Sequence, residues 1–277
     1  MYKLFAMDMD GTLLNSSREI SEKNKKVLTD AKKQNCKIVI ASGRPVEGLL
    51  RYAQSLNIVE PNQYLICFNG AVVYELNPLK VKVCNSLSGA DVRHLAKISH
   101  DFGILSHAFS ATRGLLVETE NPWTDIERTY NEIEQHFTDF NETEDEEQFY
   151  KFMFCGTKEQ LDYVEKNINE LREKYTVVRS MFCFLQFLNK KSSKGFALEE
   201  LCKVINLPLE QTVAFGDAQN DEHMLEVAGL GVAMGNAIDD LKLKANIITK
   251  TNDDDGVAIV IENILHQQKN IEANQQI

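Results

Sequence analysis

Two carboxylates stand two residues apart near the start of the chain, in the segment Asp8-Met9-Asp10-Gly11-Thr12. The segment follows an apolar run that should be buried, so the charge of Asp8 needs a partner. A divalent cation is one such partner, and Gly11 would let the chain turn sharply and let backbone N–H groups approach an anion. The ordinary alternative is a turn with solvated aspartates at the end of a strand. The spacing alone leaves both interpretations open.

Two later segments contain residue types that bind phosphate. Ser42-Gly43-Arg44-Pro45 offers a hydroxyl, a flexible backbone N–H and the start of a helix, which together suit a phosphate oxygen. Lys194 opens another helix, where its charge opposes the helix dipole unless an anion lies nearby. Each segment also has a simpler explanation: a strand-to-helix loop for the first, and a solvated lysine behind the cap residue Ser193 for the second. Lys190 and Lys191 are alternatives to Lys194.

The segment GDAQND, residues 216–221, again follows an apolar run and precedes a predicted helix. Asp217 would point into the crevice at the end of the strand, while Asp221 would support the site or cap the helix. A capped turn is the simpler alternative. The segment becomes informative only when it is combined with the other three.

Predicted strands precede three of the four segments and bring them together. Short apolar runs predict strands at 3–7, 37–41, 63–68, 212–215 and 231–233, and stretches with helical spacing separate them. This alternation favours an α/β fold with a parallel sheet covered on both faces. Ligands of such sheets bind beyond the carboxyl ends of the strands. Carboxylates, a hydroxyl, a lysine and the Asn220 amide at one edge predict a Mg²⁺ site beside a phosphoryl cradle.

The middle of the chain has a different order of elements. Helices are predicted at 91–102, 123–136 and 158–172, among strands at 104–108, 114–118, 149–155, 175–179 and 182–188. We interpret this region as a second α/β domain inserted into the first, because insertions are tolerated at exposed loops whose ends lie close together. The predicted segments are 1–83 and 187–277 for the main domain and 84–186 for the insertion.

Composition excludes several classes of protein. The formal net charge of −11 argues against binding to nucleic acid or to an anionic membrane surface. No apolar run approaches the ~18 residues of a membrane span, and no secretory signal is recognisable at the N-terminus. The six cysteines and six histidines form no CxxC or HExxH motif, which argues against a zinc site. We therefore expect a cytoplasmic protein with reduced thiols.

DMDGTLL, ASGRP, SSKG and GDAQND follow one another in the order and spacing of the four motifs of the haloacid dehalogenase superfamily, and the chain resembles its Cof-type, type IIB phosphatases. CFNGA at 67–71, GVAMGNA at 231–237 and DGVA at 255–258 extend the resemblance, which covers 1–75 and 187–265. The region between them resembles the family only in size and place. The resemblance implies a Rossmann-like parallel core sheet with an inserted α/β cap that sets substrate specificity.

The resemblance also implies a role for each matching residue. Asp8 would attack phosphorus to form an aspartyl-phosphate, and Asp10 would act as general acid and then as general base. Mg²⁺ would be bound by the carboxylates of Asp8 and Asp217 and by the backbone carbonyl of Asp10. The phosphoryl oxygens would be bound by the Met9 N–H, Ser42, Gly43, Lys194 and Asn220. Supporting residues would be Thr12, Arg44, Asn69 and Asp221.

These expectations describe a Mg²⁺-dependent phosphatase of small phosphorylated metabolites, such as sugar phosphates or phosphorylated cofactors. Two alternatives stay open: a sugar phosphomutase of the same fold and a catalytically silent protein that binds a phosphometabolite. The intact Asp8, Asp10, Lys194 and Asp217 argue against the silent protein. Neither the substrate nor the oligomeric state is specified by the sequence.

Overall fold

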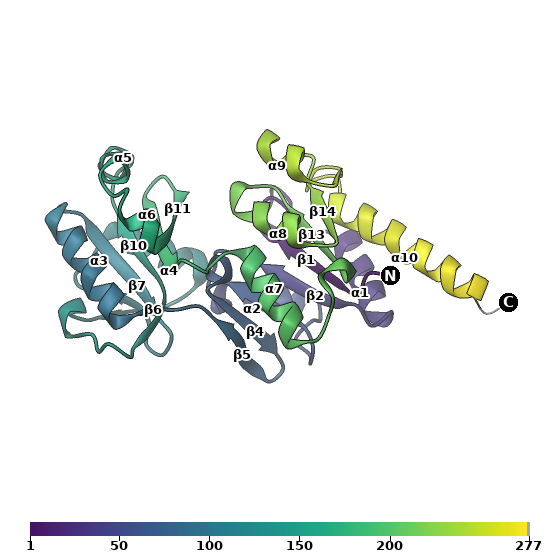
Figure 1. The fold of residues 1–277 in the computed structure, drawn as a ribbon, viewed down its shortest axis with the longest axis horizontal. Coiled ribbons are helices and arrows are strands. Elements are labelled where there is room, and N and C mark those ends of the chain that lie inside the picture. Colours follow the sequence, from purple (N-terminus) through teal and green to yellow (C-terminus); the bar gives the residue numbers. More distant parts are fainter. Residues whose placement is uncertain (276–277) are drawn as a thin grey trace. The chain divides into compact units, whose positions relative to one another are not determined.

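The computed structural model describes the backbone of residues 1–275 and the side chains of residues 1–271. The chain forms two compact units (Figure 1). The core unit contains 1–83 together with the chain from 193 onward, and the inserted unit is Cys84–Ser192. Residues 276–277 of the predicted segment 187–277 lie outside the described residues. Within 1–275, no helix combines the length and the apolarity that crossing a membrane requires.

The core unit is built on an eight-stranded sheet in the order β15-β14-β13-β1-β2-β3-β4-β5. Neighbouring strands from β15 to β3 are parallel, and β4 pairs antiparallel with β3. The central strand β1 is buried along its whole length, as expected for a parallel sheet covered on both faces. The strands are β1 (Leu4–Asp8), β2 (Lys37–Ala41), β3 (Tyr64–Cys67), β4 (Val72–Leu76), β5 (Leu79–Cys84), β13 (Thr212–Gly216), β14 (Leu230–Ala233) and β15 (Ile247–Ile248).

Within residues 1–275, six helices and three short 3₁₀ turns of the core unit connect or follow these strands. The α-helices are α1 (Glu22–Lys33), α2 (Val46–Ser55), α7 (Lys194–Val204), α8 (Glu222–Val227), α9 (Asp239–Lys244) and α10 (Gly256–Gln275), and the 3₁₀ turns are η1 (Phe68–Gly70), η3 (Leu209–Gln211) and η4 (Gln219–Asp221). Ser21 and Ser193 cap α1 and α7, because each hydroxyl accepts a hydrogen bond from a backbone N–H three residues later. These caps fix where each helix begins, and α7 therefore starts at Lys194.

The inserted unit has a sheet in the order β11-β12-β10-β7-β8-β9, with β6 paired to β10. Helices α3 and α5 cover one face around Phe152, Phe154 and Phe187, and Trp123 and Ile126 of α4 pack on a smaller cluster that includes Met153 and Phe184. The elements are β6 (Leu87–Ser88), α3 (Gly89–Asp101), β7 (Leu105–Ser110), β8 (Gly114–Val117), α4 (Pro122–Asn131), β9 (Gln135–Phe137), η2 (Phe140–Glu142), β10 (Gln148–Cys155), α5 (Lys158–Lys166), α6 (Leu171–Lys174), β11 (Tyr175–Met181) and β12 (Phe184–Asn189).

The α/β class and the parallel core sheet are confirmed, while two details of the prediction are wrong. The boundary placed after residue 186 falls inside β12, and the unit continues to Ser192, whose hydroxyl donates to the Asn85 carbonyl (3.1 Å). The helix predicted over 123–136 ends at Asn131, because Glu132 adopts a left-handed conformation (φ 57°). The chain then forms β9, which pairs parallel with β8.

Candidate active site

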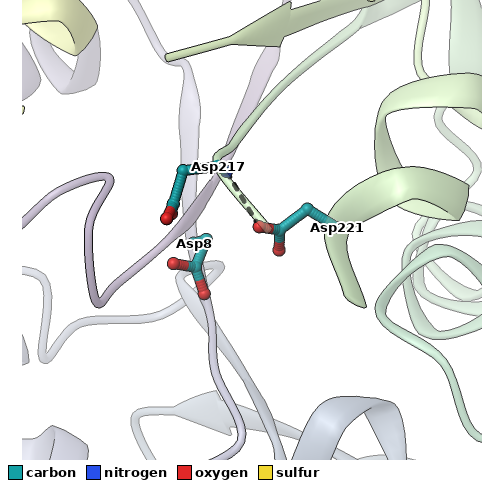
Figure 2. A group of neighbouring side chains, drawn as sticks. All are labelled: Asp8, Asp217 and Asp221. Atoms are coloured by element: carbon teal, nitrogen blue, oxygen red, sulfur yellow. Dashed lines mark hydrogen bonds between the residues drawn. The ribbon is translucent and has the colours of Figure 1, made fainter. Parts of the chain in front are cut away.

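Asp8 ends the central strand β1, between β13 and β2, and its residue is 7% exposed. The Lys194 ammonium group, which is fully buried at the first turn of α7, contacts Asp8 Oδ1 and lies 2.6 Å from Asp221 Oδ1. Asp217 follows β13, the neighbour of β1 in the sheet. Figure 2 shows the three carboxylates facing one another beyond the strand ends. The folding of a parallel sheet thus brings residues from both ends of the chain together.

Asp221 anchors this cluster through both of its oxygens. Oδ2 accepts a hydrogen bond from the Asp217 backbone N–H at 3.0 Å (Figure 2). It accepts a second from the Ala218 N–H, also at 3.0 Å, and Oδ1 accepts from Lys194. The turn fits closely around this carboxylate, since a Cβ at Gly216 would lie 2.3 Å from the Asp221 Cβ. Asp221 therefore shapes the turn and binds the lysine, and both of its oxygens are engaged in doing so.

Asp217 is held by the loop that follows β1. The buried Thr12 hydroxyl donates to Asp217 Oδ1 at 2.7 Å. Gly11 has a φ of 86°, and a Cβ there would lie 2.5 Å from Asp217 Oδ2. A side chain at position 11 would therefore be strained and would also collide with the carboxylate. The small residues at 11 and 12 let this loop approach Asp217 directly.

Negative charge is in excess in this cluster, because one ammonium group faces three carboxylates. Burial raises the pKa of Asp8 well above its ordinary value, although Lys194 acts in the opposite direction. Burial also raises the pKa of Asp217 to about 6. The pKa of Lys194 is raised in spite of its burial, because Asp221 and Asp8 stabilise the charged ammonium group. Both raised carboxyl pKa values show that further positive charge would stabilise the ionised cluster.

The donor set fits a hard divalent cation. Among the described residues, one group of at least three metal-binding side chains brings its ligand atoms within 4.8 Å of one another: Asp8, Asp217 and Asp221. Since both Asp221 oxygens are engaged, Asp8 and Asp217 are the carboxylates best placed to bind a metal. Oxygen ligands of this kind suit Mg²⁺. The predicted contribution of the Asp10 carbonyl stays a prediction.

Asp10 has a different environment from Asp8. Its side chain is 45% exposed and forms a two-point ion pair with the buried Arg44, whose Nε and Nη2 lie 3.0 and 2.5 Å from the two carboxylate oxygens. The Arg44 backbone N–H donates to Ser42 Oγ at 3.2 Å. The loop after β2 therefore holds the side chain of Asp10 in a fixed orientation, while leaving it in contact with solvent.

The remaining predicted residues lie on the loops that follow β1, β2, β3 and β13. Met9 is fully buried next to Asp8, and Ser42 is 2% exposed. Asn220 donates through Nδ2 to Asn69 Oδ1 at 3.0 Å, and a Cβ at Gly43 would lie 3.2 Å from Asn69 Nδ2. Asn69 therefore contacts the side chain of Asn220 and lies against the backbone of Gly43, both of which were predicted to bind phosphate.

Two residues that the sequence interpretation did not select contact this region. His223 Nδ1 lies 2.9 Å from the hydroxyl of Ser193, and its ring occupies the space beside Gly195. Asn236 donates through Nδ2 to the Gly11 carbonyl at 2.8 Å. Asn236 lies just after β14, so its position after a predicted strand could have identified it as a candidate site residue. His223 gave no such signal, because its position depends on the packing of α7 on α8.

Comparisons with known proteins agree with this geometry. Residues 5–261 match the family model of haloacid dehalogenase-like hydrolases. The chain is 31% identical to phosphatase YwpJ of Bacillus subtilis (strain 168), covering 95% of this chain and 100% of that protein. It is 30% identical to the 5-amino-6-(5-phospho-D-ribitylamino)uracil phosphatase YcsE of the same organism, covering 94% of each.

A solved structure shares the fold. The crystal structure of a haloacid dehalogenase-like hydrolase from Bacteroides thetaiotaomicron superposes with a TM-score of 0.85 at 32% identity, over 95% of this chain and 100% of that chain. The match extends through both units, and the family model begins one strand residue after the start of β1. By its sequence, its fold and the arrangement of its strand-end residues, this chain belongs to the haloacid dehalogenase-like hydrolases.

Proposed function

We propose that this protein is a Mg²⁺-dependent phosphatase that hydrolyses small phosphate monoesters through an aspartyl-phosphate. The observation that carries the proposal is the buried cluster at the end of β1, where Lys194 contacts Asp8 while Asp217 adds uncompensated negative charge. A nucleophilic carboxylate, a fixed cation and a place for a divalent metal are the groups that phosphoryl transfer requires. The phosphatase names of the relatives support the same activity.

In the proposed mechanism Asp8 attacks phosphorus, so that a bond forms between its carboxylate oxygen and phosphorus while the bond to the leaving oxygen breaks. Asp10 gives a proton to the leaving alkoxide and then takes one from the water that attacks the aspartyl-phosphate. That second step releases inorganic phosphate and restores the Asp8 carboxylate. Arg44 orients the Asp10 side chain by two hydrogen bonds, and Asp10 would give up one of them when it carries the proton.

The other residues of the site bind the phosphoryl group. Lys194, Ser42 and Asn220, with the backbone N–H groups of Met9 and Gly43, would neutralise and orient its oxygens. Such fixed donors stabilise the charge that develops in the transition state, and they need no reorganisation during the reaction. Bound Mg²⁺, held by Asp8, Asp217 and the Asp10 carbonyl, would supply additional positive charge at the reacting phosphate.

We further propose that the substrates are small phosphorylated metabolites and that the inserted unit supplies their specificity. One relative carries the name of a phosphatase for a ribityl-linked phosphate monoester, which belongs to this class of compound. The cytoplasmic location expected from the sequence stays a prediction. The identity of the metabolite requires a direct survey, because the residues at the strand ends act on the phosphate that all such esters share.

A metabolite survey tests this proposal. Purified protein is treated with a chelator and assayed against a panel of phosphorylated metabolites with and without added Mg²⁺, and both free phosphate and isomerised ester are measured. We expect phosphate release that requires Mg²⁺, without accumulation of an isomer. An isomer formed without phosphate release would indicate a phosphomutase. Tight ligand binding without any turnover would indicate a catalytically silent protein.

A further inference from the structure

We propose that the turn Phe68-Asn69-Gly70 positions the phosphoryl-binding loops, and that Asn69 is a positioning residue that orients the Asn220 amide. The proposal deepens the proposed function and rests on the phosphate-binding role assigned there to Asn220. It concerns η1, the short 3₁₀ turn that leaves β3. Asn69 does not have to touch the substrate, since it would act through Asn220.

The backbone of this turn is unusual. Phe68 and Asn69 are consecutive non-glycine residues with positive φ angles, 51° and 54°, and Gly70 continues with 97°. Single asparagines adopt left-handed conformations in ordinary turns, but a bulky residue such as phenylalanine rarely does. Two successive left-handed residues persist only where the surroundings hold them in place. The contacts of the turn identify those surroundings.

The turn contacts two of the predicted phosphate-binding segments through its backbone. The Asn69 N–H donates to the Ser42 carbonyl at 2.9 Å, and the Phe68 N–H donates to the Arg44 carbonyl at 3.1 Å. On its other side, Gly70 lies directly against α7: a Cβ at Gly70 would be 2.1 Å from the Ser193 carbonyl oxygen. The turn therefore links the loop after β2 to the start of α7, which carries Lys194.

The side chain of Asn69 adds the contact to the third segment. Its Oδ1 accepts from Asn220 Nδ2 at 3.0 Å, a hydrogen bond between residues 151 positions apart. An asparagine amide carries two N–H donors, so this bond engages one of them and fixes the plane in which the other points. Asn69 is 6% exposed, which excludes water from competing freely for its oxygen. The hydrogen bond thus orients the donor that Asn220 would offer to a phosphoryl oxygen.

A purely conformational role for Asn69 is the alternative, because asparagine tolerates positive φ better than most residues. Asn35 shows that role alone: it has a φ of 59° in an exposed turn after α1. Asn69→Gly and Asn35→Gly are therefore matched substitutions. Both keep a residue that adopts a left-handed backbone, and both remove the amide, but only the first removes the acceptor for Asn220.

The test compares these variants with Asn220→Ala and with the double variant Asn69→Gly/Asn220→Ala. Readouts are kcat and KM for an activated aryl phosphate, and the binding constant of inorganic phosphate. Loss of one buried hydrogen bond that orients a donor should lower kcat/KM by about 3- to 10-fold. We expect Asn69→Gly to weaken phosphate binding by a similar factor, Asn35→Gly to behave as wild type, and the double variant to match Asn220→Ala.

The double variant separates positioning from other roles. If Asn69 acts through Asn220, its substitution has no further effect once the Asn220 amide is gone. Additive losses, or equal effects of Asn69→Gly and Asn35→Gly, would overturn the proposal. Failure of the proposed function can be told apart from failure of this proposal. A wild-type protein that binds phosphate but hydrolyses no ester is not a phosphatase, yet its phosphate affinity still tests whether Asn69 acts through Asn220. A wild-type protein that neither binds nor hydrolyses phosphate overturns both proposals.

Discussion

Each unit of this molecule buries a lysine beside a carboxylate, and the two clusters differ in charge balance. In the core unit, Lys194 meets Asp8 and Asp221, and Asp217 adds a third carboxylate. In the inserted unit, Lys151 lies 2.9 Å from Glu127, and both residues are buried. The first cluster has an excess of negative charge, while the second pairs one cation with one anion.

Burial raises the carboxyl pKa values in both clusters, and the two clusters differ in whether neighbouring groups overcome that effect. In the inserted unit the pKa of Glu127 is lowered although burial opposes this, because Lys151 and other neighbours stabilise its ionised form. Asn131 donates to the second Glu127 oxygen at 2.6 Å, and the Lys151 ammonium group lies 4.6 Å from the centre of the Phe109 ring. In the core unit the pKa values of Asp8 and Asp217 are raised instead. A buried ion pair with equal positive and negative charge is therefore not itself evidence of a functional site. A buried cluster with an excess of one charge is such evidence.

Replacement of Asp8 by asparagine should have the largest effect. An amide cannot attack phosphorus, so we expect turnover to fall by ~10³-fold or more. The substitution removes one negative charge from a cluster that has an excess of negative charge. The metal-free protein should therefore keep its stability. Phosphate release and thermal unfolding in the presence of a chelator are the two measurements.

The matched control for this variant is Asp239→Asn. Asp239 lies at the start of α9 with its side chain 98% exposed, so its replacement should change neither activity nor stability. An Asp8→Asn protein that turns over as fast as wild type would refute the nucleophilic role of Asp8.

Asp10→Asn should give the next largest effect, and its size should depend on the leaving group. The backbone carbonyl at position 10 is unchanged, so Mg²⁺ binding should persist. Loss of the proton donor should slow hydrolysis of sugar phosphates by ~10²- to 10⁴-fold. An aryl phosphate, whose leaving group needs little protonation, should lose much less in its first step. Measured kcat/KM for both ester types tests this, and equal losses would argue against proton transfer by Asp10.

Glu127→Gln should affect stability without affecting chemistry. It leaves the Lys151 charge buried without its carboxylate, and breaking a buried pair in this way costs about 3 kcal/mol or more. Lys151→Met in the same chain should restore most of that loss, because no isolated charge then remains. Denaturant unfolding measures both variants. An Asp8→Asn protein that is destabilised as much as Glu127→Gln would contradict the contrast between the two clusters.

The sequence predicts the core sheet well because its strands are short, continuous apolar runs with clear ends. The strand predicted at 37–41 has the same bounds as β2, because a β-branched run defines it locally. The helix predicted to begin at Lys194 begins there in α7, because Ser193 caps it. Three of the four segments are also recognisable, because their polar residues follow directly on buried runs. Parallel pairing of β1, β2 and β13 then brings three of the segments together. Lys194 reaches them from the first turn of α7.

The features that escaped prediction depend on contacts between distant residues. Nothing local shows that α4 ends at Asn131, where the following residues pair with β8. The two-point contact of Arg44 with Asp10, and the hydrogen bond from Asn220 to Asn69, join segments 34 and 151 residues apart. The ion pair between Lys151 and Glu127 could not be predicted either, because within its own strand or helix each residue has the pattern of an ordinary exposed charge.

The smallest expected effect is a pH dependence of stability that Mg²⁺ should reverse. The pKa of Asp217 is about 6 in the folded protein and near 3.8 in an unfolded chain. Because the folded pKa is the higher one, the stabilisation is fully present below pH 3.8 and is lost as the pH rises through about 6. A shift of this size corresponds to about 3 kcal/mol. Metal binding requires ionised carboxylates, so stabilisation by Mg²⁺ should grow with pH across this window, and the raised pKa of Asp8 acts in the same direction.

The inserted unit supplies a counter-effect that the measurement must separate. Burial lowers the pKa of His107 to about 4, so its contribution to stability is present above pH 6.5 and is lost as the pH falls through about 4. This opposes Asp217 in the same window, but it should be identical with Mg²⁺ and with chelator. The difference between unfolding free energies measured with Mg²⁺ and with chelator, from pH 4.5 to 7.5, therefore isolates the core cluster. It should rise with pH in wild type and stay nearly flat in Asp217→Asn, whereas a flat wild-type difference would mean that Asp217 does not bind the metal.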